Sequence, residues 1–293
     1  MMDNDNALIE RPFLSTKEGE KFKVIKYINQ SQRHLILEAL KNVDGYFFLK
    51  RKTEEIKNNA KDFNDYFSTI KEKIDNYKND DFEDLNLLFI DFNRLFINYC
   101  TSVRTLTEIV EKKIKQAYSK ESPEFKKFEN IRNCFYDSYF SFKFLYNIRN
   151  FALHFQYPIH FVNIVFDNYI ESKPRKRDLL VMFVKQHLLQ DPDFSKKMKK
   201  DLANYGEFFP VQPIIEDSMK WIKDYFLQFI NIEKNTYLKT FDIFESLGNV
   251  YEFSNLGLSI KEKTSHTGYK ISTSIIPVPL LLEIKTNLKQ NYA

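Results

Sequence analysis

The stretch between Ser122 and Pro158 constrains the fold most strongly, because it predicts a long amphipathic helix. Ser122-Pro123-Glu124 is a helix start signal, with a capping serine followed by proline at the first helical position. The helix is expected to run towards Tyr157, just before Pro158. About 34 residues is long for a helix of a globular protein, so we expect a kink within residues 134–138.

The last turns of this helix have two different faces. At about 100° per residue, one arc is apolar and should face the protein core; it holds Leu145, Ile148, Phe151, Ala152 and Phe155. The opposite arc mixes polar residues with an apolar pair; it holds Arg149, Leu153, Tyr146, Asn150, His154 and Asn147. This mixture is typical of a surface that contacts another protein.

Arg149 and His154 are the candidate catalytic residues on the mixed arc. They lie roughly 140° apart round the helix, whereas Asn150 lies one turn before His154. Guanidinium offers a forked donor to phosphate oxygens, and imidazole can transfer a proton near neutral pH. RNA supplies a nucleophile in its 2′-hydroxyl, so cleavage needs a base, an acid and positive charge. Two copies of this helix about a two-fold axis would provide two imidazoles and two guanidinium groups.

The segment at Arg149, Asn150 and His154 resembles the R-N-x3-H form of the R-x4-6-H motif of HEPN domains, a superfamily of helical ribonucleases. The resemblance extends over residues 81–158 as a helical core. It implies metal-independent RNA cleavage at a composite homodimer site, in toxins or antiviral defence effectors. It also implies an antitoxin or regulatory partner, no metal and no cofactor. Tyr146 and Asn150 are expected to support the catalytic pair.

Arg104 and Glu108 are four residues apart on the preceding helix. They either orient the motif from a second layer or form an ordinary surface ion pair, which is the more common case. Arg132-Asn133 repeats Arg149-Asn150, but position 137 is Asp where the motif requires His. The sequence therefore predicts one motif.

Three cations in a basic turn, Arg175, Lys176 and Arg177, either contact RNA phosphates or belong to a solvated loop. His160 and His187 lie in apolar runs, where histidine is more often packed than a ligand.

Composition excludes several classes of protein. The two cysteines form no C-x-x-C pair, so neither a disulfide framework nor a zinc site is indicated. No secretory signal and no apolar run of about 18 residues is present, so a soluble cytoplasmic protein is expected. Phosphate-binding glycine loops, serine nucleophile elbows and H-E-x-x-H are absent. The net charge of +4 permits RNA binding without arguing for it.

The predicted fold class is mainly α (α+β): a HEPN-like helical bundle with a small β component after the motif helix and a C-terminal hairpin. We expect a flexible arm at 1–15, a helical HEPN-like domain at 16–158 and a mixed α/β region at 159–293. Within the first domain, helices are predicted at 16–43, 53–77 and 85–118, with a turn at Asp44-Gly45, a strand at 46–49 and a break at 79–81. Beyond this domain, a strand is predicted within 159–170. Residues 179–184 are predicted to form either a strand or the start of a helix. Helices at 193–205, 211–232 and 236–247 then precede the hairpin of 250–261 and 269–276 and a final helix at 277–288.

Three functions remain open from the sequence. The first is a homodimeric endoribonuclease. The second is a non-catalytic HEPN-like dimeric scaffold or partner-binding module, in which the same residues hold an interface. The third is a nucleic-acid-binding regulator that uses the C-terminal hairpin as part of a winged module, although this hairpin contains no arginine.

Overall fold

The computed structural model describes residues 12–18, 21–76, 84–166, 177–192, 194–248, 252–253, 256–263 and 269–290. The chain is mainly helical with two small antiparallel sheets, which confirms the coarse fold class. It divides into two compact units, one formed by Met1–Leu49 with Ile230–Ala293 and the other by Lys50–Phe229. These units differ from the division at residue 158 that the sequence suggests.

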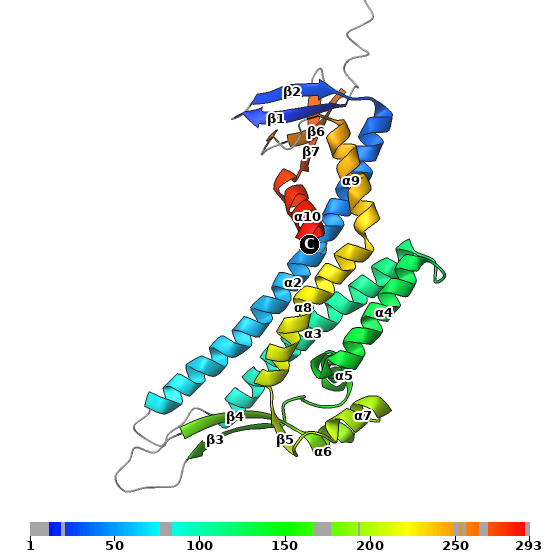
Figure 1. Cartoon of the computed structure of the whole chain (residues 1–293). Helices are drawn as coiled ribbons and strands as arrows, with labels where there is room; N and C mark the ends of the chain where they lie inside the picture. Colours follow the sequence, from blue (N-terminus) through cyan, green and yellow to red (C-terminus); the bar gives the residue numbers. More distant parts are fainter. Residues whose placement is uncertain are drawn as a thin grey trace, which may run out of the picture. The chain divides into compact units, whose positions relative to one another are not determined.

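A four-stranded sheet in the order β2-β1-β6-β7 lies in the first unit (Figure 1). Its strands are β1 (Phe13–Glu18), β2 (Lys21–Tyr27), β6 (Leu256–Lys263) and β7 (Tyr269–Ile276). The prediction of an arm at 1–15 is therefore wrong for residues 13–15, and residues 1–11 lie outside the described residues. The predicted helix from residue 16 is wrong up to Tyr27, because the helix begins at Gln30. Strand β1 is held by partners on both sides, and its partner β6 lies far along the chain, so no local pattern reveals the pairing.

The C-terminal hairpin, formed by β6 and β7, is confirmed, and its predicted turn at 264–268 lies outside the described residues. Because β6 also pairs with β1, the hairpin is part of a larger sheet and not an isolated wing. Three predicted helices are confirmed as α8 (Gln212–Ile232), α9 (Lys234–Ser246) and α10 (Val278–Gln290). Gly248 follows the end of α9 and has φ of 104°, a left-handed conformation that commonly terminates helices.

Helix α2 (Gln30–Asn76) passes through Gly45 without a turn, so the predicted turn at 44–45 and strand at 46–49 are wrong. Val43, Tyr46 and Leu49 are fully buried at helical spacing. Their burial outweighs the cost of one glycine in a helix, which is about 1 kcal/mol. The predicted break at 79–81 lies outside the described residues.

In the second unit, α3 (Leu85–Ala117) packs against α4 (Pro123–Ser138) and α5 (Phe140–His154). The Ser122 cap is confirmed, since its Oγ accepts from the Phe125 N–H at 3.1 Å. The expected kink is a break at Tyr139, where φ of −114° and ψ of 114° leave the helical region. The predicted long helix is therefore two helices, and α5 is positioned separately from α4.

The chain after α5 enters a sheet in the order β3-β4-β5, with β3 (Phe161–Phe166), β4 (Arg177–Val184) and β5 (Phe208–Pro210). Two short helices, α6 (Lys185–Leu189) and α7 (Lys196–Leu202), lie between β4 and β5. Asn93 of α3 is fully buried and donates to the Ile159 carbonyl at 3.0 Å. Its Oδ1 accepts from the Ile159 N–H at 2.9 Å. This two-way contact fixes the path of the chain as it leaves α5.

Candidate active site

The inner face of α5 supports the predicted motif from the protein core. Leu145, Ile148 and Phe151 are fully buried, as the apolar arc predicts. Ala152 is half-buried. Phe155 is 47% exposed, so the prediction that it belongs to the core is wrong. The reason is that α5 ends at His154, and Phe155 has left the helical conformation with φ of −122° and ψ of −70°.

The outer face of α5 carries the mixed surface that the sequence predicts. Tyr146, Asn150, Leu153 and His154 are exposed, and Arg149 is half-buried. His154 is the last residue of α5, and its side chain makes no hydrogen bond or ion pair within the described part of the chain. Its imidazole is thus accessible from solvent.

The Arg149 guanidinium is held by one weak contact, its Nη1 donating to Asn150 Oδ1 at 3.3 Å. Its buried Nε has no hydrogen-bond partner, and Arg149 makes no ion pair with any described carboxylate. A buried donor without a partner costs about 1–3 kcal/mol, so this arrangement does not serve stability. Burial raises the pKa of the Cys100 thiol to about 12, and the nearby Arg149 charge opposes this shift.

Arg104 and Glu108 of α3 form the predicted pair, with 2.7 Å between Nε and Oε1. Only 11% of the Arg104 side chain is exposed, and its guanidinium carbon lies 3.1 Å from the centre of the Tyr146 ring. Arg104 Nη1 is buried without a partner. The Arg104–Glu108 pair therefore contacts the motif helix α5 through Tyr146. The cation–π contact between Arg104 and Tyr146 stabilises the packing of α3 on α5 by about 0.5–2 kcal/mol.

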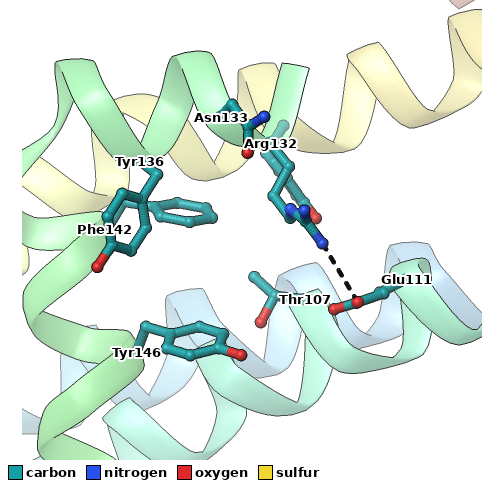
Figure 2. Close-up of a pocket in the computed structure, with 8 residues that line it drawn as sticks. Thr107, Glu111, Arg132, Asn133, Tyr136, Phe142 and Tyr146 are labelled. Carbon is teal, nitrogen blue, oxygen red and sulfur yellow. Dashed lines mark hydrogen bonds and ion pairs between the residues drawn. The ribbon is translucent and has the colours of Figure 1, made fainter. Parts of the chain in front are cut away.

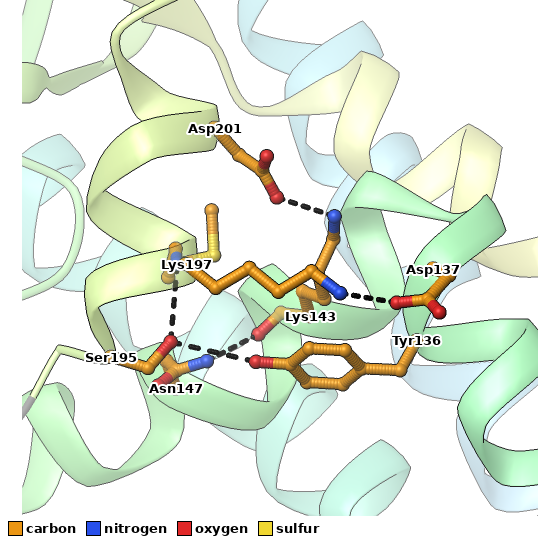
Figure 3. Close-up of polar contacts among 8 residues, drawn as sticks. Tyr136, Asp137, Lys143, Asn147, Ser195, Lys197 and Asp201 are labelled. Atoms are coloured by element: carbon orange, nitrogen blue, oxygen red, sulfur yellow. Dashed lines mark hydrogen bonds and ion pairs between the residues drawn. The ribbon is translucent and has the colours of Figure 1, made fainter.

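A group of polar contacts joins the start of α5 to α7 (Figure 3). Lys143 has 8% of its side chain exposed and forms an ion pair with Asp201. Asn147 Nδ2 donates to the Lys143 carbonyl at 2.7 Å, and the more exposed Lys197 pairs with Asp137. The buried lysine fixes α5 one to two turns before the motif. Sequence patterns do not reveal this, because lysine in a helix usually points to solvent.

His160 and His187 form a second pair of imidazoles, with ring centres 4.7 Å apart and nearly perpendicular planes. Both ring nitrogens of His160 are buried and have no hydrogen-bond partner among the described residues. Burial lowers the pKa of His160 to about 4, and His187 contributes to this shift. His160 is therefore a packed neutral histidine, as its apolar context predicts. The same prediction is wrong for His187, which is exposed.

Replacing His160 with Leu is expected to flatten the pH dependence of stability between pH 6.5 and 4. Unfolded histidine titrates near 6.5 and folded His160 at about 4, so in this range the unfolded chain binds a proton that the folded chain does not. Stability of the native protein should fall by about 1–3 kcal/mol over this range, with partial solvent exposure reducing the full effect. Urea denaturation at several pH values measures it. His34→Leu, at an exposed position, should keep the native pH profile.

A pocket of about 290 Å³ opens between α3, α4, α5 and α8 (Figure 2). Its aromatic lining comes from Tyr136, Phe142, Tyr146 and Tyr225, and its polar lining from Thr107, Glu111, Arg132 and Asn133. No sequence pattern predicts this site, and Arg132-Asn133 stands out in the sequence only as an incomplete repeat of the motif. Tyr146 thus contacts Arg104 and also lines the pocket.

The remaining predicted site residues lie elsewhere. Arg177 is the first residue of β4 and its Nη1 donates to the Ile74 carbonyl at 3.3 Å. Arg175 and Lys176 lie outside the described residues.

Among the residues that the structure describes, no three His, Cys, Asp or Glu side chains gather as a metal site. Within the same residues, no helix has the length and apolar character needed to cross a membrane. Comparisons with protein families, curated proteins and solved structures find no match to this chain.

Proposed function

We propose that this protein is a metal-independent endoribonuclease of HEPN-like type, with Arg149 and His154 as its catalytic pair. The observation that carries the proposal is the state of Arg149. Arg149 is half-buried on the same helix as the exposed His154. No described carboxylate forms an ion pair with the Arg149 guanidinium, and its buried Nε has no hydrogen-bond partner. A structural arginine would normally have such a partner, whereas one that receives a phosphate from a substrate is left without one.

The chemistry follows from the groups that these residues offer. The 2′-oxygen of RNA attacks the adjacent phosphorus and gives its proton to one imidazole. The bond from phosphorus to the 5′-oxygen breaks, and a second imidazole donates a proton to that oxygen. Guanidinium stabilises the charge that develops on the phosphate oxygens. The products are a 2′,3′-cyclic phosphate and a 5′-hydroxyl end.

Two imidazoles are required, and each α5 supplies only His154, so the proposed enzyme is a homodimer with α5 helices facing each other. Exposed apolar residues near the motif support such a contact. Leu153 is 49% exposed, Phe155 47% and Tyr157 51%. Large apolar side chains around a functional group are typical of a surface covered by a partner.

The test of the function is cleavage of a single-stranded RNA by the full chain in excess EDTA. Cleavage is expected to persist, because attack by the 2′-oxygen needs no metal-bound water, and the fragments should carry the two ends named above. An RNA with methylated 2′-oxygens, which lacks the nucleophile, should remain intact. Cleavage that requires magnesium, or that proceeds on the methylated RNA, would reject this chemistry.

Leu153→Asp is expected to separate the dimer, since two carboxylates across a two-fold contact lose hydration and repel each other. The dimer dissociation constant should rise on the order of 100-fold or more. Sedimentation velocity at micromolar concentration should give twice the 35.2 kDa chain mass for the native protein and the single chain mass for the variant. Leu238→Asp is the matched control, because Leu238 is 41% exposed but lies on α9. A native protein that is monomeric with and without RNA would exclude the composite site.

The alternative is a non-catalytic dimeric scaffold that uses the same exposed apolar residues. The two functions give the same sedimentation result and opposite cleavage results. A native dimer that leaves RNA intact, with Leu153→Asp still splitting it, would favour the scaffold.

A further inference from the structure

The pocket beside the motif helix combines a buried floor with an accessible rim. Phe142, Tyr225 and Thr107 are buried at its floor, whereas Asn133 is exposed at its rim. Its volume of about 290 Å³ is at the lower end for ligand sites, which span roughly 300–1,000 Å³. A space of this size, walled by rings, suits one planar aromatic group. Unpaired bases of RNA bind in this way, stacked on aromatic side chains and hydrogen-bonded at their edges.

The pocket is close to the proposed catalytic residues along α5. Tyr146 lines the pocket and lies eight residues before His154, which at 1.5 Å per residue is about 12 Å along the helix axis. Asn150 lies one turn beyond Tyr146 on the same side. An RNA strand with its scissile phosphate near Arg149 and His154 would therefore present a neighbouring base to the pocket.

The polar groups of the pocket indicate which base it accepts. Glu111 Oε1 lies 3.3 Å from Arg132 Nη1 and 2.6 Å from Lys115 Nζ, while no described residue donates a hydrogen bond to Glu111 Oε2 (Figure 2 shows the Arg132 contact). A carboxylate accepts two parallel hydrogen bonds from adjacent N–H groups, one at each oxygen, and here the exposed Lys115 would give up its place at Oε1 to the base. Guanine presents such a pair at N1 and its 2-amino group, whereas adenine, cytosine and uracil each place an acceptor beside their donor. Arg132 can donate to guanine O6, which neighbours N1.

We propose that this pocket binds a guanine base of the RNA substrate and so sets where the chain cuts. Glu111 accepts from the Watson–Crick edge, the aromatic walls stack on the ring, and Asn133 contacts it at the rim. This inference rests on the proposed function for its role in cleavage, but base binding itself can be measured without cleavage.

The test is isothermal titration of the full chain with the 5′-monophosphates of guanosine, inosine and adenosine. All three carry the same sugar and phosphate, so differences report on the base. Guanosine monophosphate should bind roughly 5- to 150-fold more tightly than adenosine monophosphate, with inosine monophosphate between them because it lacks the 2-amino group. Equal binding of the guanine and adenine nucleotides, or no binding of the guanine nucleotide, would overturn the proposal.

Glu111→Gln should remove the preference for guanine, because an amide offers one acceptor and one donor in place of two acceptors. Glu129→Gln is the matched control. Glu129 is 3.9 Å from Arg132, so the control removes a carboxylate from the same guanidinium, but Glu129 does not line the pocket. The control should keep the native preference, and unchanged selectivity in Glu111→Gln would contradict the assigned role. The same thermal unfolding midpoint in both variants shows that they fold. If guanine binds but RNA is not cleaved, the proposed function fails; if RNA is cleaved but guanine does not bind, this inference fails.

Discussion

His154→Ala is expected to reduce RNA cleavage by about 10²- to 10⁴-fold, the usual contribution of a positioned acid or base. His154 is the exposed last residue of α5 and has no hydrogen-bond partner in the described part of the chain, so its removal should leave the fold intact. Single-turnover cleavage of a labelled RNA measures the loss. Sedimentation and thermal unfolding of the variant should match those of the native protein.

The control for this variant is His34→Ala, which removes an exposed histidine of α2 in the other unit and should leave the cleavage rate unchanged. Loss of activity in His154→Ala together with loss of the dimer would indicate only an interface role. Full activity in a folded His154→Ala dimer would rule out this imidazole as the proton donor or acceptor.

Asp201→Asn is expected to destabilise the second unit by about 3 kcal/mol, because it leaves the buried Lys143 ammonium without its counter-charge. Loss of one partner of a buried pair usually costs about 3–5 kcal/mol, and water that reaches the 26% exposed Asp201 side chain limits the effect here. Urea denaturation followed by the fluorescence of Trp221 measures it. Trp221 is the one tryptophan of the chain and is 1% exposed in the same unit.

Two further variants isolate the cause of this loss. Asp137→Asn removes the exposed partner of Lys197 and should leave the urea midpoint of unfolding unchanged. Adding Lys143→Met to Asp201→Asn should restore stability, because the buried charge is then gone and the methionine fills its space. A midpoint that does not move in Asp201→Asn would show that water or another group satisfies Lys143.

The local parts of the fold were predictable from sequence, because they depend on neighbouring residues. The Ser122 cap and the buried arc of Leu145, Ile148 and Phe151 follow from patterns within a few turns. The helix ends at His154, earlier than the predicted end near Tyr157. The apparent turn at Gly45 was wrong, since burial of Tyr46 and Leu49 keeps the helix continuous.

The surroundings of the motif were less accessible to sequence analysis, because they depend on contacts between elements. Nothing local marks Lys143 as buried, since its partner Asp201 lies on α7. The spacing of Arg104 and Glu108 predicts their pairing, but the stacking of the Arg104 guanidinium on Tyr146 depends on how α3 packs against α5. The pocket combines residues of four helices, and its polar members resemble ordinary surface charges until those helices pack.

The pairing of β1 with β6 sets the order in which the chain can fold during synthesis. Residues 50–229 form the second unit from one continuous stretch, which can collapse as soon as it leaves the ribosome. Strands β1 and β2 leave the ribosome before the second unit, but Leu14 of β1 waits for its partner Leu258, more than two hundred residues later. Throughout that interval the edge of β1 that β6 later covers is open to pairing with other chains. The edge of β1 that β6 covers is thus made before the second unit and is covered only after it.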